Sequence, residues 1–250
     1  VTAPSNLMKH GKVVIITGAT RGIGRYAAHS FAQEGVQIAL VGRDDGRLRR
    51  VSGELREMGA DVLAVRADVR SEDEVSGMVD QIVRRFGYID VLVNNAAVVT
   101  HFAMGYPRWP RIRDMEKDFW DDVIQTNLGG TFLYTKHILP HMEKRKSGHI
   151  INLYGGANVK SLGSCAYVVS KEAIRAFTRY VAEEEREWNI CVVAMTPGKA
   201  VATEEAPQEA RRRLPGLEMM GNAFIQAAEA PMEWTGELLF VEDDRLQVMP

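Results

Sequence analysis

The chain has 250 residues, 46% of them apolar, and is long enough to bury a substantial hydrophobic core. Its 31 basic and 33 acidic residues leave a net charge of -2, which argues against a nucleic-acid-binding surface. No apolar run approaches the ~20 residues that span a bilayer, so no membrane partner is expected. Residues 1–10 lack the apolar segment of a signal peptide, and Cys165 and Cys191 lack the spacing of a metal or redox site. We therefore expect a short tail over 1–10 and a cytoplasmic protein with reduced thiols.

Short apolar runs alternate with helix-length segments along the chain, which is the pattern of strands joined by helices. The run Val13–Thr17 leads into a glycine-rich turn, as expected of a strand buried on both faces. Similar runs follow at 36–41, 62–65, 91–93, 150–153, 191–195 and 238–241. A helix is predicted over 71–86, where Ser71 is a suitable N-cap and three acidic residues suit the helix dipole. The pattern predicts a single α/β domain over 11–250, a Rossmann-type doubly wound sheet of seven parallel strands with helices on both faces.

A glycine-rich turn, TGATRGIG, joins the first predicted strand to the first predicted helix. Glycines at this place permit a tight turn and let backbone N–H groups approach a pyrophosphate at the helix N-terminus. A purely structural bend is the alternative, but the strand-to-helix position favours a dinucleotide site. The residues expected to bind the dinucleotide are Gly18, Thr20, Arg21, Gly22, Ile23 and Gly24.

The order of several motifs resembles the short-chain dehydrogenase/reductase family. The TGxxxGIG turn is followed by Ala-Asp-Val at 67–69, Asn-Asn-Ala at 94–96, Asn127, Tyr167-x-x-x-Lys171 and Pro197-Gly198. The resemblance extends from Lys12 to about Val241, nearly the whole chain. It implies hydride transfer between a nicotinamide and a small-molecule carbonyl or alcohol, carried out by a homodimer or homotetramer. The further cofactor contacts that it implies are Asp68, Val69, Asn95, Ala96, Lys171, Pro197 and Gly198.

The end of the second predicted strand bears on the choice of cofactor. NAD enzymes usually place a carboxylate there to accept hydrogen bonds from the ribose hydroxyls. Here Gly42 holds that place and Arg43 follows it, and a guanidinium suits the extra 2′-phosphate of NADP. Arg21 in the glycine turn is a second positive charge, and Asp44 is expected to cap the next helix. A merely solvated Arg43 is the alternative, but the charges favour NADP(H) over NAD(H).

Tyr167 and Lys171 are four residues apart, so on a helix they project from the same face. A phenol with a reference pKa near ~10 is a poor acid–base catalyst at neutral pH, and a nearby ammonium moves its pKa toward a useful value. The resemblance implies that Tyr167 exchanges a proton with the substrate oxygen, while Lys171 binds the ribose and tunes the tyrosine. An exposed helix pair without a catalytic role is the alternative.

Asn127 interrupts an apolar helical face and is followed by Gly129 and Gly130, which weaken the helix locally. A buried amide at this place needs hydrogen-bond partners. A satisfied structural asparagine is one interpretation. The resemblance implies the other, a role in a proton-relay network of the active site.

One departure from the family's pattern concerns the substrate oxygen. The family's catalytic serine usually lies thirteen residues before the tyrosine, where this chain has Tyr154. Removing an oxyanion donor of this kind typically lowers the rate by about 10²–10³. We hypothesise that Tyr154 lines the pocket, where it either donates a hydrogen bond in place of the serine or narrows the site. Ser161 and Ser164 are alternative donors, and Gly155 and Gly156 permit the strand end to shift.

Two segments are candidates for the substrate side, 98–118 with its aromatic and arginine residues, and 197–215 as a loop or lid. His137 and His141 share a helical face without a third ligand, so no metal site is expected.

The leading hypothesis is an NADP(H)-dependent oxidoreductase that acts on CH–OH or C=O groups. A dinucleotide-binding protein that has lost hydride transfer is one alternative, and an isomerase or lyase that uses Tyr167 is the other.

Overall fold

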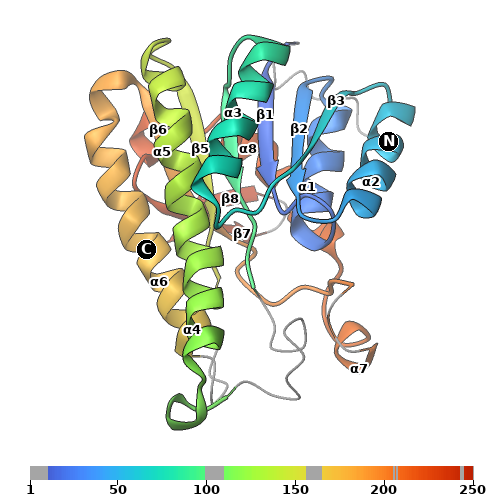
Figure 1. The fold of residues 1–250 in the computed structure, drawn as a ribbon, viewed down its shortest axis with the longest axis vertical. Helices are drawn as coiled ribbons and strands as arrows, with labels where there is room; N and C mark the ends of the chain where they lie inside the picture. The colour runs from blue at the N-terminus through green and yellow to red at the C-terminus, as the bar shows by residue number, and fades with distance from the viewer. Residues whose placement is uncertain are drawn as a thin grey trace.

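The computed structural model describes residues 11–98, 110–155, 165–204, 206, 208–242 and 245–249. One eight-stranded sheet runs through it in the order β3-β2-β1-β4-β5-β6-β7-β8 (Figure 1). The strands are β1 (Val13–Thr17), β2 (Gln37–Gly42), β3 (Asp61–Arg66), β4 (Val91–Asn94), β5 (Gly148–Leu153), β6 (Ile190–Thr196), β7 (Leu238–Glu242) and β8 (Arg245–Val248). Strands β1 to β7 pair in parallel, as predicted. The order reverses between β1 and β4, and in sheets of this kind ligands bind at such a point.

The eighth strand corrects the prediction of seven. β8 pairs antiparallel with β7, with Leu239 opposite Val248. Only Leu246 of this strand is buried, and its N–H donates to Gln226 Oε1 at 2.9 Å. A short edge strand with a single buried residue carries no apolar run, so the pattern that revealed the other strands could not reveal this one.

Helices cover both faces of the sheet (Figure 1). One face is covered by α1 (Gly22–Gln33), α2 (Asp45–Glu57) and α8 (Ala223–Ala228), and the other by α3 (Glu72–Phe86), α5 (Gly130–Glu143) and α6 (Cys165–Glu184). The remaining helical elements are η2 (Ile112–Asp114), α4 (Lys117–Ile124), η3 (Gln125–Gly129), η4 (Arg186–Trp188), α7 (Gln208–Arg211), η5 (Leu217–Met220) and η6 (Met232–Trp234). None of the helices within the described ranges is long and apolar enough to cross a membrane.

The core has two halves because side chains alternate across each strand. Val14 and Ile16 of β1 face α1 and α2, whereas Val13 and Ile15 face α3 and α5. All four side chains are fully buried. Burial on both faces therefore explains why the central strands are continuous apolar runs.

Both helix caps that the sequence predicts are present. Asp44 Oδ1 accepts a hydrogen bond from Arg47 N at 2.9 Å at the start of α2, and Ser71 Oγ accepts one from Glu74 N at 3.4 Å at the start of α3. These caps satisfy backbone N–H groups that have no partner within the helix. They fix where α2 and α3 begin, and with them the loops that follow β2 and β3.

Candidate active site

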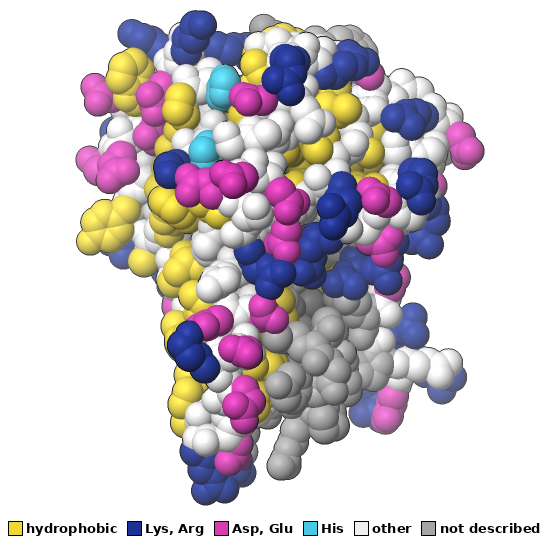
Figure 2. Space-filling model, in the orientation of Figure 1, with side chains coloured by type: hydrophobic (Ala, Val, Ile, Leu, Met, Phe, Trp, Pro, Cys, Tyr) yellow, Lys and Arg dark blue, Asp and Glu magenta, His cyan; other side chains and the backbone are white. Residues whose placement is uncertain are grey.

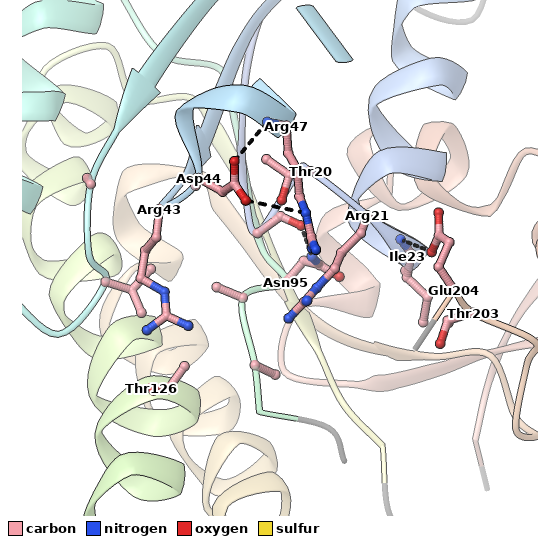
Figure 3. Close-up of a pocket in the computed structure, with 17 residues that line it drawn as sticks. Thr20, Arg21, Ile23, Arg43, Asp44, Arg47, Asn95, Thr126, Thr203 and Glu204 are labelled. Carbon is pink, nitrogen blue, oxygen red and sulfur yellow. Dashed lines mark hydrogen bonds and ion pairs between the residues drawn. The ribbon is translucent and has the colours of Figure 1, made fainter. Parts of the chain in front are cut away.

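A cleft of about 390 Å³ opens at the carboxyl ends of β1 to β4 (Figure 3). Nine residues predicted to bind the cofactor line it together: Gly18, Thr20, Arg21, Gly22, Ile23, Arg43, Val69, Asn95 and Ala96. Six other lining residues are not among the predicted cofactor contacts: Arg47, Ala67, Ala97, Thr126, Thr203 and Glu204. Arg47 follows Asp44 by three residues and donates its N–H to the Asp44 cap. The predicted cap at Asp44 could therefore have indicated that Arg47 lies at the cleft.

The turn between β1 and α1 needs glycines because neighbouring backbone atoms lie too close to it to leave room for a Cβ. Gly18 has a φ of +63°, and a Cβ there would lie 2.8 Å from the Cα of Ala96. Asn95 holds the turn in place, since its Nδ2 donates to the carbonyls of Thr17 at 2.9 Å and Gly18 at 3.1 Å. Gly24 lies where a Cβ would collide with Gly18 O and with Asn95. A side chain at Gly18 or Gly24 would therefore displace the turn that forms this end of the cleft.

Three arginines, Arg21, Arg43 and Arg47, line the cleft near the end of β2 (Figure 3). Asp44 also lines this part of the cleft, and its carboxylate makes two contacts with Arg47. Arg47 N donates to Oδ1 at 2.9 Å, and Arg47 Nε lies 3.4 Å from Oδ2. The hydrogen bond from Arg47 N lowers the pKa of Asp44. Asp44 thus serves as the cap of α2, and the arginines give this end of the cleft its positive charge.

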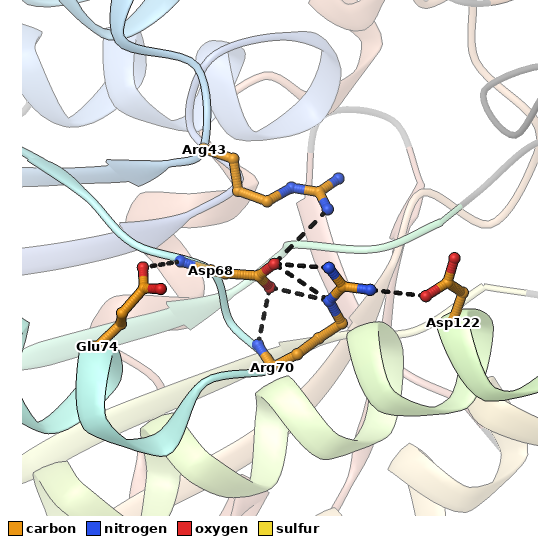
Figure 4. Close-up of polar contacts among 5 residues, drawn as sticks. All are labelled: Arg43, Asp68, Arg70, Glu74 and Asp122. Carbon is orange, nitrogen blue, oxygen red and sulfur yellow. Dashed lines mark hydrogen bonds and ion pairs between the residues drawn. The ribbon is translucent and has the colours of Figure 1, made fainter. Parts of the chain in front are cut away.

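Asp68 belongs to an ion-pair cluster beside the cleft (Figure 4). Arg70 Nη2 lies 2.7 Å from Asp68 Oδ2, and Arg70 Nη1 lies 2.6 Å from Asp122 Oδ1 on α4. The Arg70 hydrogen bonds lower the pKa of Asp68. Arg43 Nη1 is 3.9 Å from Asp68 Oδ2, and the Arg43 side chain is 57% exposed. Because Arg70 already neutralises Asp68, Arg43 is only loosely engaged and can turn toward an anion in the cleft.

Tyr167 and Lys171 lie on the first turns of α6, where Lys171 is buried and Tyr167 is partly buried. Lys171 Nζ donates to Leu153 O at 2.7 Å and lies 6.0 Å from the centroid of the Tyr167 ring. Burial raises the pKa of Tyr167 to about 12 and lowers the pKa of Lys171 to about 8. The expected lowering of the tyrosine pKa by the ammonium is therefore not seen here, because desolvation raises that pKa. At neutral pH Tyr167 is a neutral phenol, the form that donates a proton to a carbonyl oxygen.

Asn127 is fully buried in the π-helical turn η3, between α4 and α5. Its Oδ1 accepts from Val98 N at 2.7 Å, and its Nδ2 donates to Ser170 Oγ at 2.9 Å. Ser170 Oγ in turn donates to Tyr167 O at 2.7 Å. The amide thus ties the end of the β4 segment to the turn of α6 that lies between Tyr167 and Lys171. Its partners make Asn127 a positioning residue, and its predicted part in a proton relay stays a prediction.

The structure corrects the place expected for Tyr154. Its ring is buried in a cluster with Ala194 and Leu238, and its hydroxyl hydrogen-bonds Glu172. The next residue, Gly155, is the one that faces Tyr167, because a Cβ there would lie 2.8 Å from Tyr167 Oη. Successive residues at a strand end point to opposite sides. The position beside the Tyr167 hydroxyl is therefore 155, and it has no side chain to hold a substrate oxygen.

Other predicted features lie partly outside the described residues. Pro197 is buried after β6, and Gly198, with a φ of +79°, donates its N–H to Thr196 Oγ1 at 3.2 Å. Ser161, Ser164 and most of the aromatic part of 98–118 lie outside the described residues. Within the described part of the chain, no group of three His, Cys, Asp or Glu side chains is placed to hold a metal ion.

The fold and the cleft define a class of protein, a single-domain oxidoreductase that uses a dinucleotide. Residues 12–213 match the family model for short chain dehydrogenases, and the chain belongs to this family. It is accordingly an NAD(P)-dependent oxidoreductase that acts on CH–OH or C=O groups.

Individual relatives span most of the domain. The chain is 37% identical over 198 residues to 3-oxoacyl-(acyl-carrier-protein) reductase FabG of Staphylococcus aureus, covering 78% of this chain and 77% of FabG. It is 31% identical over 235 residues to (2S)-((R)-hydroxy(phenyl)methyl)succinyl-CoA dehydrogenase subunit BbsD of Thauera aromatica, covering 93% of this chain and 90% of BbsD. An NAD+-bound xylitol dehydrogenase superposes with a TM-score of 0.82 at 27% identity, covering 92% of this chain and 97% of that structure.

Proposed function

We propose that the protein is an NADP(H)-dependent oxidoreductase that transfers hydride between the nicotinamide and a small-molecule carbonyl or alcohol. The choice of cofactor rests on the three arginines that line the cleft near the end of β2, where Gly42 stands in place of a ribose-binding carboxylate. The glycine turn of α1 would hold the pyrophosphate. Tyr167 would exchange the proton with the substrate oxygen, and Lys171 would hold the nicotinamide ribose. The cytoplasmic location expected from the sequence stays a prediction.

The preference for NADPH is tested by Arg43→Glu. A hydrogen bond to a charged group contributes about 1.5–3 kcal/mol, so the variant should bind NADPH roughly 10- to 100-fold more weakly, with NADH affinity little changed. The measurement is the dissociation constant of each cofactor by fluorescence titration. Arg49→Glu is the matched control. Arg49 is exposed, as Arg43 is, but it lies on α2 and does not line the cleft. Equal affinity of the unmodified protein for NADPH and NADH would contradict the assignment.

We further propose that two copies of the chain associate through an apolar hollow on α4, α5 and α6. The hollow is lined by Ile124, Gln125, Leu128, Gly129, Phe132 and Phe177, and Phe132 is 47% exposed. Figure 2 shows hydrophobic side chains along this edge of the molecule. Permanent interfaces between identical subunits are apolar in this way.

Phe132→Asp tests the proposed association. A charge in the centre of an apolar interface should shift a dimer or tetramer to a smaller species in sedimentation velocity. Met58→Asp is the control, because Met58 is a similarly exposed apolar residue, at the end of α2. A monomeric unmodified protein, or a Phe132→Asp variant of unchanged mass, would count against this interface.

A further inference from the structure

Helix α1 begins without a cap of its own. Its N-cap residue, Arg21, makes no side-chain hydrogen bond to the helix, and the first turn of α1 contains no acidic residue. The N-terminus of a helix carries a partial positive charge of roughly half an elementary charge, and its free N–H groups attract anions. In this structure the anion comes from a distant part of the chain. Glu204 Oε2 accepts a hydrogen bond from Gly22 N at 2.8 Å, although the two residues are 182 positions apart.

Glu204 is brought to this place by backbone contacts around it. Ala202 N donates to Pro215 O at 2.8 Å, and Ala206 N donates to Thr203 O at 3.1 Å. Thr203 packs on the glycine turn, since its Cγ2 lies 3.4 Å from the place that a Cβ on Gly22 would take. Both Thr203 and Glu204 line the cofactor cleft, and Figure 3 shows the Glu204 carboxylate at the backbone that opens α1.

The contact is weak enough to be reversible. The Glu204 side chain is 50% exposed, and its second oxygen lies 3.7 Å from Arg25 Nη1. Arg25 has a closer partner in Glu54, with Nη2 and Oε2 2.9 Å apart. The main attraction on Glu204 is therefore the helix N-terminus, and an exposed charge there changes an equilibrium by about two- to fivefold.

We propose that Glu204 competes with the pyrophosphate of the cofactor for the N-terminus of α1, so that the cofactor must displace this carboxylate in order to bind. The inference rests on the proposed function, which places the pyrophosphate at the same turn. The N–H of Gly22 cannot donate to the carboxylate and to the pyrophosphate at once, and two negative groups at the same turn repel each other. Glu204 thus lowers the affinity for the cofactor. It also couples cofactor binding to a movement of residues 202–204, which follow Gly198 and the end of β6.

The test compares Glu204→Gln with Glu209→Gln. Glu209 lies on α7, is exposed, and pairs with Arg213 at 2.8 Å, so its substitution removes one negative charge near the same segment without touching α1. Two ligands are titrated at low ionic strength, NADPH and adenosine 2′-phosphate. The second probe has the 2′-phosphate but no pyrophosphate.

Glu204→Gln should lower the dissociation constant of NADPH by about two- to fivefold and leave that of adenosine 2′-phosphate unchanged, and Glu209→Gln should change neither. An NADPH constant that is unchanged or higher in Glu204→Gln would overturn the competition. Equal tightening of both ligands would also overturn it, because the cause would then be overall charge. If the unmodified protein bound neither ligand, the proposed function itself would fail, and the inference with it.

Discussion

Tyr167→Phe is expected to lower kcat by about 10³–10⁴ and to leave the affinity for NADPH nearly unchanged. General acid–base groups contribute about 10²–10⁴ in rate. The upper part of this range applies because Gly155, the residue that faces the Tyr167 hydroxyl, has no side chain to assist it. The phenol is neutral at neutral pH, and burial raises its pKa further, to about 12, so it carries a proton that can be donated in the reductive direction. The measurement is steady-state NADPH oxidation with a panel of aldehydes and ketones, together with an NADPH titration.

Tyr154→Phe is the matched control for this prediction. It removes the same hydroxyl from a tyrosine near the same site, but one whose hydroxyl engages Glu172. We expect its rate to stay within a few-fold of the unmodified enzyme. A loss of about 10²–10³ in Tyr154→Phe would restore the sequence-based hypothesis that Tyr154 holds the substrate oxygen. More than about a tenth of the activity left in Tyr167→Phe would remove the proton-transfer role from Tyr167.

The features that sequence patterns predict well here are local. The seven parallel strands are apolar runs because both faces of the sheet are covered, and the glycine turn and the Tyr167–Lys171 pair depend on spacings of a few residues. β8 was missed because an edge strand with one buried residue has no such pattern.

Features that depend on distant contacts or on strand direction could not be predicted in this way. The family's spacing of thirteen residues predicts Tyr154 beside Tyr167. The direction of the side chains at the end of β5 decides the matter, and it places Gly155 there. Glu204 meets Gly22 across 182 positions, and no local spacing encodes that contact. Arg70, in the loop between β3 and α3, likewise meets Asp122 on α4 across 52 positions.

Lys171→Met is expected to abolish most of the activity without destabilising the fold. The loss of rate should be at least about 10² if the lysine has its proposed role, which is to hold the reacting end of the cofactor beside Tyr167. Lys171 is a buried cation whose pKa falls from 10.5 to about 8 through desolvation. The shift corresponds to about 3 kcal/mol of cost to the folded state at pH 7, partly offset by the hydrogen bond to Leu153 O. Methionine has a similar length and no charge, so the variant should be more stable by about 1 kcal/mol at pH 7, or roughly 2–4 °C in Tm.

The pH dependence of this difference identifies its cause. Between about pH 8 and pH 10.5 the unfolded chain holds the lysine proton and the folded chain does not, so the stability of the unmodified protein rises with pH relative to the variant. The Tm of the variant should therefore exceed that of the unmodified protein near pH 7 and fall below it by pH 10. Thermal unfolding of both proteins at four or five pH values measures it, and every other titrating group is common to the two. Two results would contradict this account: a Lys171→Met variant less stable than the unmodified protein at pH 7, or a difference in Tm that does not change with pH. Either would mean that burial does not destabilise the ammonium, and that Lys171 is held by partners stronger than the Leu153 carbonyl.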